Sequence, residues 1–230
     1  MSFLDNILNW FNQKQVVSPI VAQTPLSPVT PIINPAVTPP AHVENPPVDV
    51  FNTIALPLIL IFEGGLTNDK NDKGGRTDFG ITQTEYDLYR SSKKLPTQTV
   101  SNISSAEVKD IYLNNYWLPS KCDQMGSKLS VVMFDTSVNM GQGRSVKFLQ
   151  EAIGAKVDGV IGQETVAKMK TMDVNALANT YISTRKTFYQ DIVKKDPTQQ
   201  EFLGGWLRRV QFVSDYISGI KTLDQIRKSW

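Results

Sequence analysis

A strongly apolar stretch runs from Phe51 to Phe62 and ends at Glu63-Gly64-Gly65. It is shorter than the roughly 20 residues that a membrane-spanning helix needs, so the pattern predicts a buried helix. Pro57 is expected either in the first turn of that helix or at a kink. A glycine pair typically ends a helix, because glycine accepts the left-handed backbone conformation. We therefore expect Glu63 to be the last residue of an apolar helix.

A glutamate in that position has unusual chemistry. The negative end of the helix dipole disfavours a carboxylate there, and apolar neighbours such as Ile61 and Phe62 disfavour its charged form. Both effects raise the pKa of Glu63, and a carboxylic acid that is still protonated near neutral pH can serve as a general acid. The alternative is a solvated glutamate that precedes a Gly-Gly turn.

Apolar periodicity and capping signals predict a series of helices after residue 81. Their expected ranges are 82–89, opened by a capping box at Thr82 and Glu85, then 104–118, 129–139, 145–153, 165–172, 174–192 and 202–217. Asp173 is expected to cap the long helix at 174–192. The pair Gly204-Gly205 indicates close contact between helices. The body of the chain is therefore predicted to be mainly α.

Between the first helix and this series lies a turn-rich polar segment. Leu66-Thr67 and Phe79-Gly80-Ile81 look like short strands around it, which makes the fold class α+β with one small hairpin beside Glu63. The run from Asp69 partly resembles a calcium loop, but Gly80 stands where a bidentate glutamate belongs. We therefore expect no metal and no cofactor.

The first 48 residues differ in composition from the rest. Residues 1–15 place Phe3, Ile7 and Phe11 on one helical face, with Asn and Gln largely on the other, so an amphipathic anchor helix is predicted. It lacks the basic start and apolar core of a conventional signal peptide. Its polar face has few basic residues, so docking to a protein is favoured over membrane contact, with packing on its own domain as a further alternative. Residues 16–48 are rich in proline and predict an extended linker.

Charge and composition exclude several classes of function. A net charge of +2 over 230 residues is too small to indicate a nucleic-acid partner, and one cysteine, Cys122, permits no internal disulfide. The one histidine, His42, falls in the proline-rich linker. Hydrolases that use a histidine-bound zinc, a Ser-His-Asp triad or a Cys-His pair all need a positioned imidazole. If the chain is a hydrolase, carboxylates are therefore expected to perform the chemistry.

The ordered set of motifs resembles glycoside hydrolase family 108, the phage and bacterial N-acetylmuramidases with an EGG motif. The resemblance covers about residues 50–220. The residues that carry it are Glu63-Gly64-Gly65-Leu66-Thr67-Asn68-Asp69, Asp72, Gly74-Gly75, Thr77, Gly80-Ile81-Thr82 and Tyr116-Trp117. A later set resembles that family's predicted peptidoglycan-binding segment, namely Phe134-Asp135, Asn139, Gly141, Leu149-Gln150, Asp158-Gly159, Ile161-Gly162, Thr165, Gly205-Trp206 and Arg209.

The resemblance implies a lysozyme-like fold that hydrolyses the bond between N-acetylmuramic acid and N-acetylglucosamine in peptidoglycan. It implies Glu63 as the general acid, Asp72 as the group that activates water or stabilises the oxocarbenium charge, and Thr77 as the group that positions the water. Thr77 comes one residue earlier than in phage lysozymes, and Asp78 occupies the expected place. The remaining residues matched as substrate contacts are Asp69, Gly80, Ile81, Thr82 and Asn139.

The resemblance also divides the chain into a catalytic lobe at 49–127 and a helical, peptidoglycan-binding-like lobe at 128–230. The second lobe is either a wall-binding site or simply the other half of one lysozyme fold. The anchor and linker favour a virion-associated enzyme on a phage tail or baseplate, with a phage structural protein as the partner of residues 1–48. The alternatives are a free endolysin, held in the host cytoplasm before it reaches the wall, and a catalytically silent tail protein that binds peptidoglycan.

Overall fold

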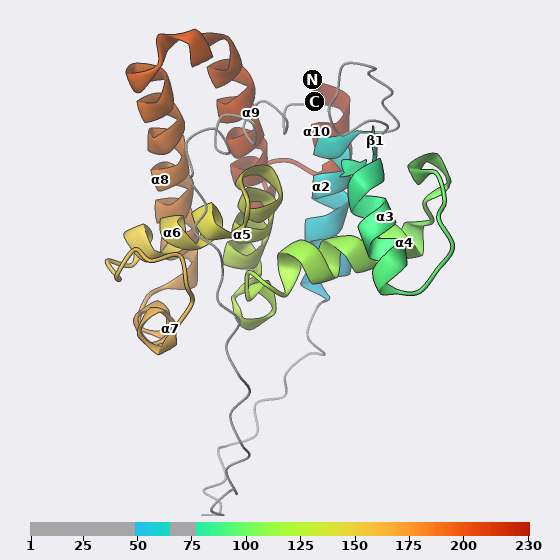
Figure 1. The fold of residues 1–230 in the computed structure, drawn as a ribbon. Helices are drawn as coiled ribbons and strands as arrows, with labels where there is room; N and C mark the ends of the chain where they lie inside the picture. Colours follow the sequence, from blue (N-terminus) through green and yellow to red (C-terminus); the bar gives the residue numbers. More distant parts are fainter. Residues whose placement is uncertain (1–48, 65–76) are drawn as a thin grey trace, which may run out of the picture.

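The computed structural model of the protein describes residues 49–64 and 77–230 (Figure 1). Its elements in chain order are η1 (Phe51–Ala55), α2 (Leu56–Glu63), β1 (Thr77–Asp78), β2 (Ile81–Thr82), α3 (Gln83–Ser92), η2 (Val100–Asn102), α4 (Ser105–Tyr112), η3 (Leu113–Trp117), η4 (Cys122–Gln124), α5 (Ser127–Met140), α6 (Gln142–Ala152), α7 (Gln163–Lys170), α8 (Val174–Lys195), η5 (Pro197–Gln199), α9 (Gln200–Ile217) and α10 (Leu223–Ser229). The predicted anchor helix, the linker, Asp69 and Asp72 lie outside the described residues.

Helix α2 ends at Glu63, as the sequence predicted. Pro57 lies in its first turn, directly after the π-helical turn η1, so the missing N–H falls where the backbone passes from π-helical to α-helical hydrogen bonding. The helix stops at Gly64, whose φ of 68° is readily available only to glycine. Leu58 and Ile59 are buried, so packing of the apolar face fixes the direction in which Glu63 projects.

Helix α5 forms the centre of the molecule. Almost its whole length is buried, and it packs against α6, α8 and α9 as well as against η1, η3 and η4. Figure 1 shows α8 and α9 antiparallel to each other, with α9 overlapping α5 in this view and α2, α3 and α4 on the side of α5 away from α8. The described residues thus form a mainly helical fold with one two-stranded sheet, which confirms the predicted fold class.

The hairpin differs from the prediction in which residues form its strands. The predicted strand at Leu66-Thr67 lies outside the described residues. Strand β1 pairs antiparallel with β2, so that Thr77 lies opposite Thr82 and Asp78 opposite Ile81. Phe79 and Gly80 are therefore the turn rather than a strand. Both have positive φ, 51° and 75°, which is the backbone of the turns that best fit the twist of a hairpin. Periodicity could not reveal this, because two-residue strands are too short to alternate.

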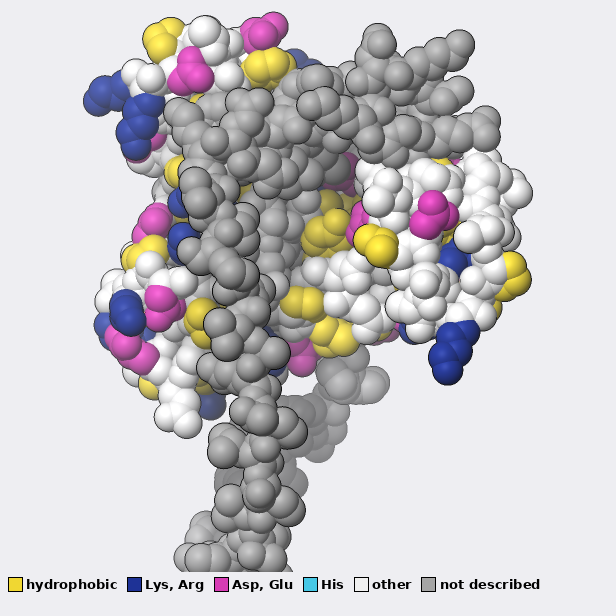
Figure 2. Space-filling view, viewed as in Figure 1, with side chains coloured by type: hydrophobic (Ala, Val, Ile, Leu, Met, Phe, Trp, Pro, Cys, Tyr) yellow, Lys and Arg dark blue, Asp and Glu magenta, His cyan; other side chains and the backbone are white. Residues whose placement is uncertain are grey.

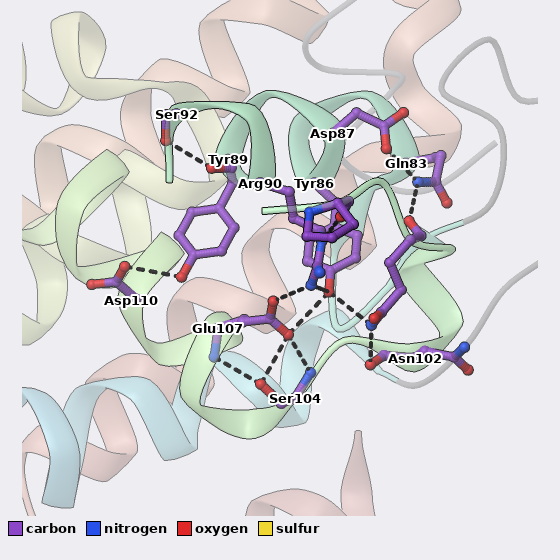
Figure 3. Close-up of polar contacts among 12 residues, drawn as sticks. Gln83, Tyr86, Asp87, Tyr89, Arg90, Ser92, Asn102, Ser104, Glu107 and Asp110 are labelled. Carbon is purple, nitrogen blue, oxygen red and sulfur yellow. Dashed lines mark hydrogen bonds and ion pairs between the residues drawn. The ribbon is translucent and has the colours of Figure 1, made fainter. Parts of the chain in front are cut away.

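A polar cluster joins α3 to α4 in the smaller half of the fold. Figure 3 shows Arg90 and Tyr86 of α3 pointing toward Glu107 of α4. The Arg90 Nη1 atom donates to Glu107 Oε1 over 2.6 Å, and the Tyr86 hydroxyl donates to Glu107 Oε2 over 3.0 Å. Glu107 also closes a capping box with Ser104. This cluster fixes the orientation of α3, which begins directly after the hairpin.

The predicted capping box at the start of α3 is only half formed. The Thr82 hydroxyl accepts a hydrogen bond from the Glu85 backbone N–H, as expected for an N-cap. The Glu85 carboxylate, however, accepts from Asn115 Nδ2 at 3.1 Å and from the Tyr116 hydroxyl at 3.3 Å instead of returning to Thr82. Tertiary partners thus replace the local partner.

The remaining helices agree with the prediction except at a few places. Asp173 caps α8 by accepting from the Ala176 N–H, as expected. Helix α10 had not been predicted; it buries Ile226, and the Trp230 ring lies 4.7 Å from that of Phe62. The predicted close helix contact at the Gly204-Gly205 pair is wrong for Gly204, since a Cβ there would meet no atom within 4 Å; for Gly205 it stays a prediction.

The surface of the described part carries mixed charges. On the face shown in Figure 2, Lys and Arg side chains are interspersed with Asp and Glu side chains. Among residues 49–64 and 77–230, every helix is too short or too polar to cross a membrane.

Candidate active site

The Glu63 side chain is enclosed by protein, with 5% of its surface exposed. Its Oε1 atom lies 2.8 Å from Nη2 of Arg209, which comes from α9. Neither atom has a partner aligned for a hydrogen bond among the described residues, so the contact is an ion pair without that alignment. Burial raises the pKa of Glu63 above its ordinary range, and the positive charge of Arg209 opposes that rise.

Arg209 belongs to a buried row of alternating charges. Its Nε atom donates to Asp135 Oδ1 over 2.9 Å, and Arg185 of α8 donates through Nη1 to the other oxygen of Asp135. Asp135 and Arg185 have no exposed side-chain surface, and that of Arg209 is 1% exposed. The two guanidinium groups hold the pKa of Asp135 below its usual range despite its burial. Asp135 is therefore an anion that orients Arg209 toward Glu63.

Asn139 lies at the far end of this row. It is fully buried, and its Oδ1 atom accepts from Arg185 Nη2 at 3.1 Å and from the Tyr189 hydroxyl at 2.6 Å. That burial contradicts the direct substrate contact that the resemblance implied. Asn139 instead orients Arg185, one turn of α5 away from Asp135.

The hairpin turn contacts Glu63 from the other side. A Cβ atom placed on Gly80 would lie 2.9 Å from Glu63 Cβ and 2.9 Å from the Tyr112 hydroxyl. That hydroxyl donates to the Phe79 carbonyl over 2.7 Å. Glycine is thus the one residue type that, at position 80, lets the turn approach Glu63 this closely.

The other predicted site residues that the structure describes near the hairpin are buried or cap a helix. Ile81 is buried in the core, and Thr82 caps α3. Thr77 and Asp78 are both largely buried, and the Thr77 hydroxyl has no hydrogen-bond partner among the described residues. An unpartnered hydroxyl in this position is compatible with the predicted role in holding a water molecule. That role and those of Asp69 and Asp72 stay predictions.

We expect Gly80→Ala to lower both stability and turnover. The positive φ and the contacts with Glu63 and Tyr112 together predict a loss of about 1–3 kcal/mol in the free energy of unfolding and a displaced Glu63. Gly219→Ala is the matched control, because Gly219 has a φ of 72° but open space around it. Thermal unfolding and hydrolysis rates would be measured for both variants. Equal losses of turnover in the two would show that backbone strain, not contact with Glu63, is the cause.

Sequence reasoning missed the roles of Asp135, Arg185 and Arg209, although two of them were within the matched motifs. A usable signal existed. Asp135 is a charged residue within the apolar run at 131–134, and such residues are rarely buried without a partner of opposite charge. Arg185 and Arg209 stand next to Lys186 and Arg208, so the local sequence gives no such signal for them. What the sequence did not reveal was which of them pair, because the partners are separated by 50 and 74 residues.

This arrangement can hold and release a proton at Glu63 in a site shielded from water. Within the described parts of the chain, no group of three or more His, Cys, Asp or Glu side chains is placed to hold a metal ion. Glu63 and Arg209 themselves offer acid–base chemistry at a carboxyl group whose charge is balanced by a fixed arginine.

Comparison with known proteins relates the segment that contains this site to a family. Residues 56–141, which contain Glu63 and Asp135, match the family model described as Glycosyl hydrolase 108. The chain carries a glycosyl hydrolase 108 domain. Residues 144–211 match the model described as Predicted Peptidoglycan domain, so this glycosyl hydrolase degrades peptidoglycan and has a peptidoglycan-binding domain. The predicted boundary between lobes at residues 127 and 128 stays a prediction.

The fold of this glycosyl hydrolase is shared with a solved structure. The structure of Brucella abortus SagA matches with a TM-score of 0.58 and 27% sequence identity, and the match covers 72% of this chain and 92% of that chain. No curated protein sequence matches the chain. The lysozyme-like fold predicted from the motifs is thus confirmed for the glycosyl hydrolase 108 domain.

Proposed function

We propose that the protein is an N-acetylmuramidase, which hydrolyses the β-1,4 bond between N-acetylmuramic acid and N-acetylglucosamine in peptidoglycan. The observation that carries this proposal is the Glu63 carboxyl group, which is buried at the end of an apolar helix, has a raised pKa and contacts a fixed arginine. A retained proton is what a glycosidic leaving group requires.

In this mechanism Glu63 donates its proton to the glycosidic oxygen as the bond breaks. The sugar ring then carries oxocarbenium character, which a second carboxylate stabilises either directly or by activating a water molecule. We assign that second role to Asp72 and the positioning of the water to Thr77. Release of the proton leaves Glu63 charged, and Arg209 at 2.8 Å stabilises that charge.

Analysis of the reaction products tests this assignment. Purified peptidoglycan would be digested, and the fragments would be reduced with borohydride and identified by mass spectrometry. A muramidase creates new reducing ends on N-acetylmuramic acid, so reduced muramic acid is expected at the end of the fragments. Fragments that end in reduced N-acetylglucosamine would instead indicate a glucosaminidase.

We further propose that the enzyme is attached to a phage particle through residues 1–48. The support is compositional: an amphipathic segment at 1–15 is separated from the catalytic domain by a proline-rich stretch. A free endolysin has no evident need for such a segment. The presence of a peptidoglycan-binding domain is compatible with either mode of delivery.

Deletion of residues 1–48 is expected to leave the rate of hydrolysis of isolated peptidoglycan within about twofold of that of the full chain, because the residues assigned to catalysis, Glu63, Asp72 and Thr77, all follow residue 48. The same deletion is expected to abolish co-sedimentation with particles. Replacing Phe3, Ile7 and Phe11 with serine in the full chain should have the same effect, because it removes only the apolar face. Normal co-sedimentation of both variants would contradict attachment through this segment.

A further inference from the structure

The buried row of charges crosses the boundary between the two matched families. Glu63 and Asp135 belong to the segment matched at 56–141, whereas Arg185 and Arg209 belong to the segment matched at 144–211. The ion pairs Glu63–Arg209, Asp135–Arg209 and Asp135–Arg185 all join one segment to the other. A module that only binds the wall would not be expected to place its arginines against a buried carboxyl group in its neighbour.

We propose that the C-terminal helices α8 and α9 complete the active site, with Arg209 as the positioning residue for Glu63 and Asp135 as the residue that orients Arg209. This inference rests on the proposed role of Glu63 as the proton donor. It assigns to the segment matched as a peptidoglycan domain a part in catalysis, in addition to any binding of the wall.

The geometry fixes the Arg209 guanidinium group on three sides. Asp135 accepts from its Nε atom, Glu63 lies at its Nη2 atom, and the Phe62 ring lies 4.8 Å from its central carbon. The group therefore cannot follow Glu63 if that side chain moves. A fixed positive charge beside the carboxyl group stabilises the anion that remains after proton transfer.

The buried row of charges also determines how much positive charge Arg209 presents to Glu63. Asp135 carries one negative charge but contacts two guanidinium groups, so it cannot neutralise both. One positive charge is left to face Glu63. Burial raises the pKa of Glu63, Arg209 lowers it, and Asp135 raises it again to a smaller extent.

Other charged or titratable groups of the described residues lie further out. Burial raises the pKa of the hydroxyls of Tyr112 of α4 and Tyr116 of η3, and the negative charge of Glu63 raises both further. Both hydroxyls therefore stay neutral. Glu85 of α3 lies behind Tyr116, to which it is hydrogen-bonded. Helix α10 packs against α2 through Trp230, while the side chains of Asp224 and Arg227 are exposed. Of the charged side chains in the described residues, Arg209 is the cation that contacts Glu63.

The test compares two substitutions that should move the pKa of Glu63 in opposite directions. Arg209→Gln removes the neighbouring positive charge and should raise that pKa by about 1–3. Asp135→Asn leaves two arginines beside Glu63 and should lower it by about 1 or more. Arg209→Lys keeps the charge and should leave the pKa close to that of the wild type. The pKa would be read directly by ¹³C NMR of labelled glutamate, with the Glu63 signal assigned by its loss in Glu63→Gln.

The second readout is the pH profile of kcat/KM on solubilised peptidoglycan. A general acid must be protonated, so activity falls as pH rises through its pKa. Arg209→Gln should therefore move the alkaline limb to higher pH with a lower maximum, and Asp135→Asn should move it to lower pH. Arg90→Gln is the control, since it also breaks a largely buried ion pair, with Glu107, but away from Glu63. It should lower stability and leave the limb in place.

Each outcome decides the question. Shifts of the same sign in Arg209→Gln and Asp135→Asn, or no shift in either, would overturn the inference. If only one of them folds, the sign of its shift against Arg209→Lys decides. If neither folds, Arg209→Lys decides: an alkaline limb close to that of the wild type is expected, and a limb moved to higher pH, as if no cation were present, would overturn the inference. A responsive Glu63 pKa in a protein that does not hydrolyse peptidoglycan would instead refute the proposed function and leave the electrostatic coupling intact.

Discussion

Glu63→Gln is expected to leave the protein folded and to lower its turnover of peptidoglycan by about 100- to 10,000-fold. The carboxamide has nearly the shape and the charge of the protonated carboxyl group, so the contacts with Arg209 and Gly80 can persist. It has no proton to give to a glycosidic oxygen. Release of soluble muropeptides from purified walls would be followed over time, together with thermal unfolding of the same preparation.

Glu85→Gln is the matched control for this substitution. Glu85 is the other described glutamate whose pKa is raised mainly by burial, and it lies behind Tyr116, which the Glu63 charge also affects. Its carboxylate is already hydrogen-bonded to Asn115 and Tyr116. We expect turnover within about tenfold of the wild type. If Glu85→Gln lost most of its turnover while Glu63→Gln kept it, the proton donor would be Glu85 of α3 and not Glu63.

The fold was predictable where one physical signal dominated. The apolar run, Pro57 and Gly64 together specified α2 and the position of Glu63, because burial, proline geometry and a positive φ all agree there. The hairpin was not predictable in detail. Its strands at 77–78 and 81–82 are two residues each, and the turn is identified by their pairing and by the positive φ of Phe79 and Gly80; the sequence does not reveal the positive φ of Phe79. Helix α10 is short and amphipathic, and its position depends on Trp230 meeting Phe62.

The site was predictable at Glu63 but not in its surroundings. A residue at a helix end with apolar neighbours has local causes for a raised pKa, and these are visible in the sequence. The pairing of Glu63 with Arg209 is different, since it depends on how α9 packs against α2 and α5. Asn139 illustrates the same limit, because a polar residue in a matched motif can face the substrate or the interior. Only the tertiary structure, which buries it against Arg185 and Tyr189, decides between these roles.

The second large effect is expected at Asp72, and the surroundings of Glu63 support that choice by elimination. Asp135 is held between Arg185 and Arg209, so it is unable to activate water or stabilise a sugar cation. Glu85 is held by Asn115 and Tyr116. The second carboxylate is therefore expected from the residues between α2 and the Phe79-Gly80 turn, where Asp72 has the spacing from Glu63 that phage-type lysozymes use.

Asp72→Asn is accordingly expected to lower kcat by about 100-fold or more with little change in stability. Asp69→Asn should lower stability more than turnover, since aspartate side chains in turns bond nearby backbone amides. Asp78→Asn should have little effect on kcat, because neighbouring strand residues point to opposite faces and Thr77 is assigned to the water. Rates on solubilised peptidoglycan and thermal unfolding of the three variants would be compared. If Asp78→Asn lost most of its kcat while Asp72→Asn kept it, the second carboxylate would instead lie on β1, directly before the Phe79-Gly80 turn that contacts Glu63.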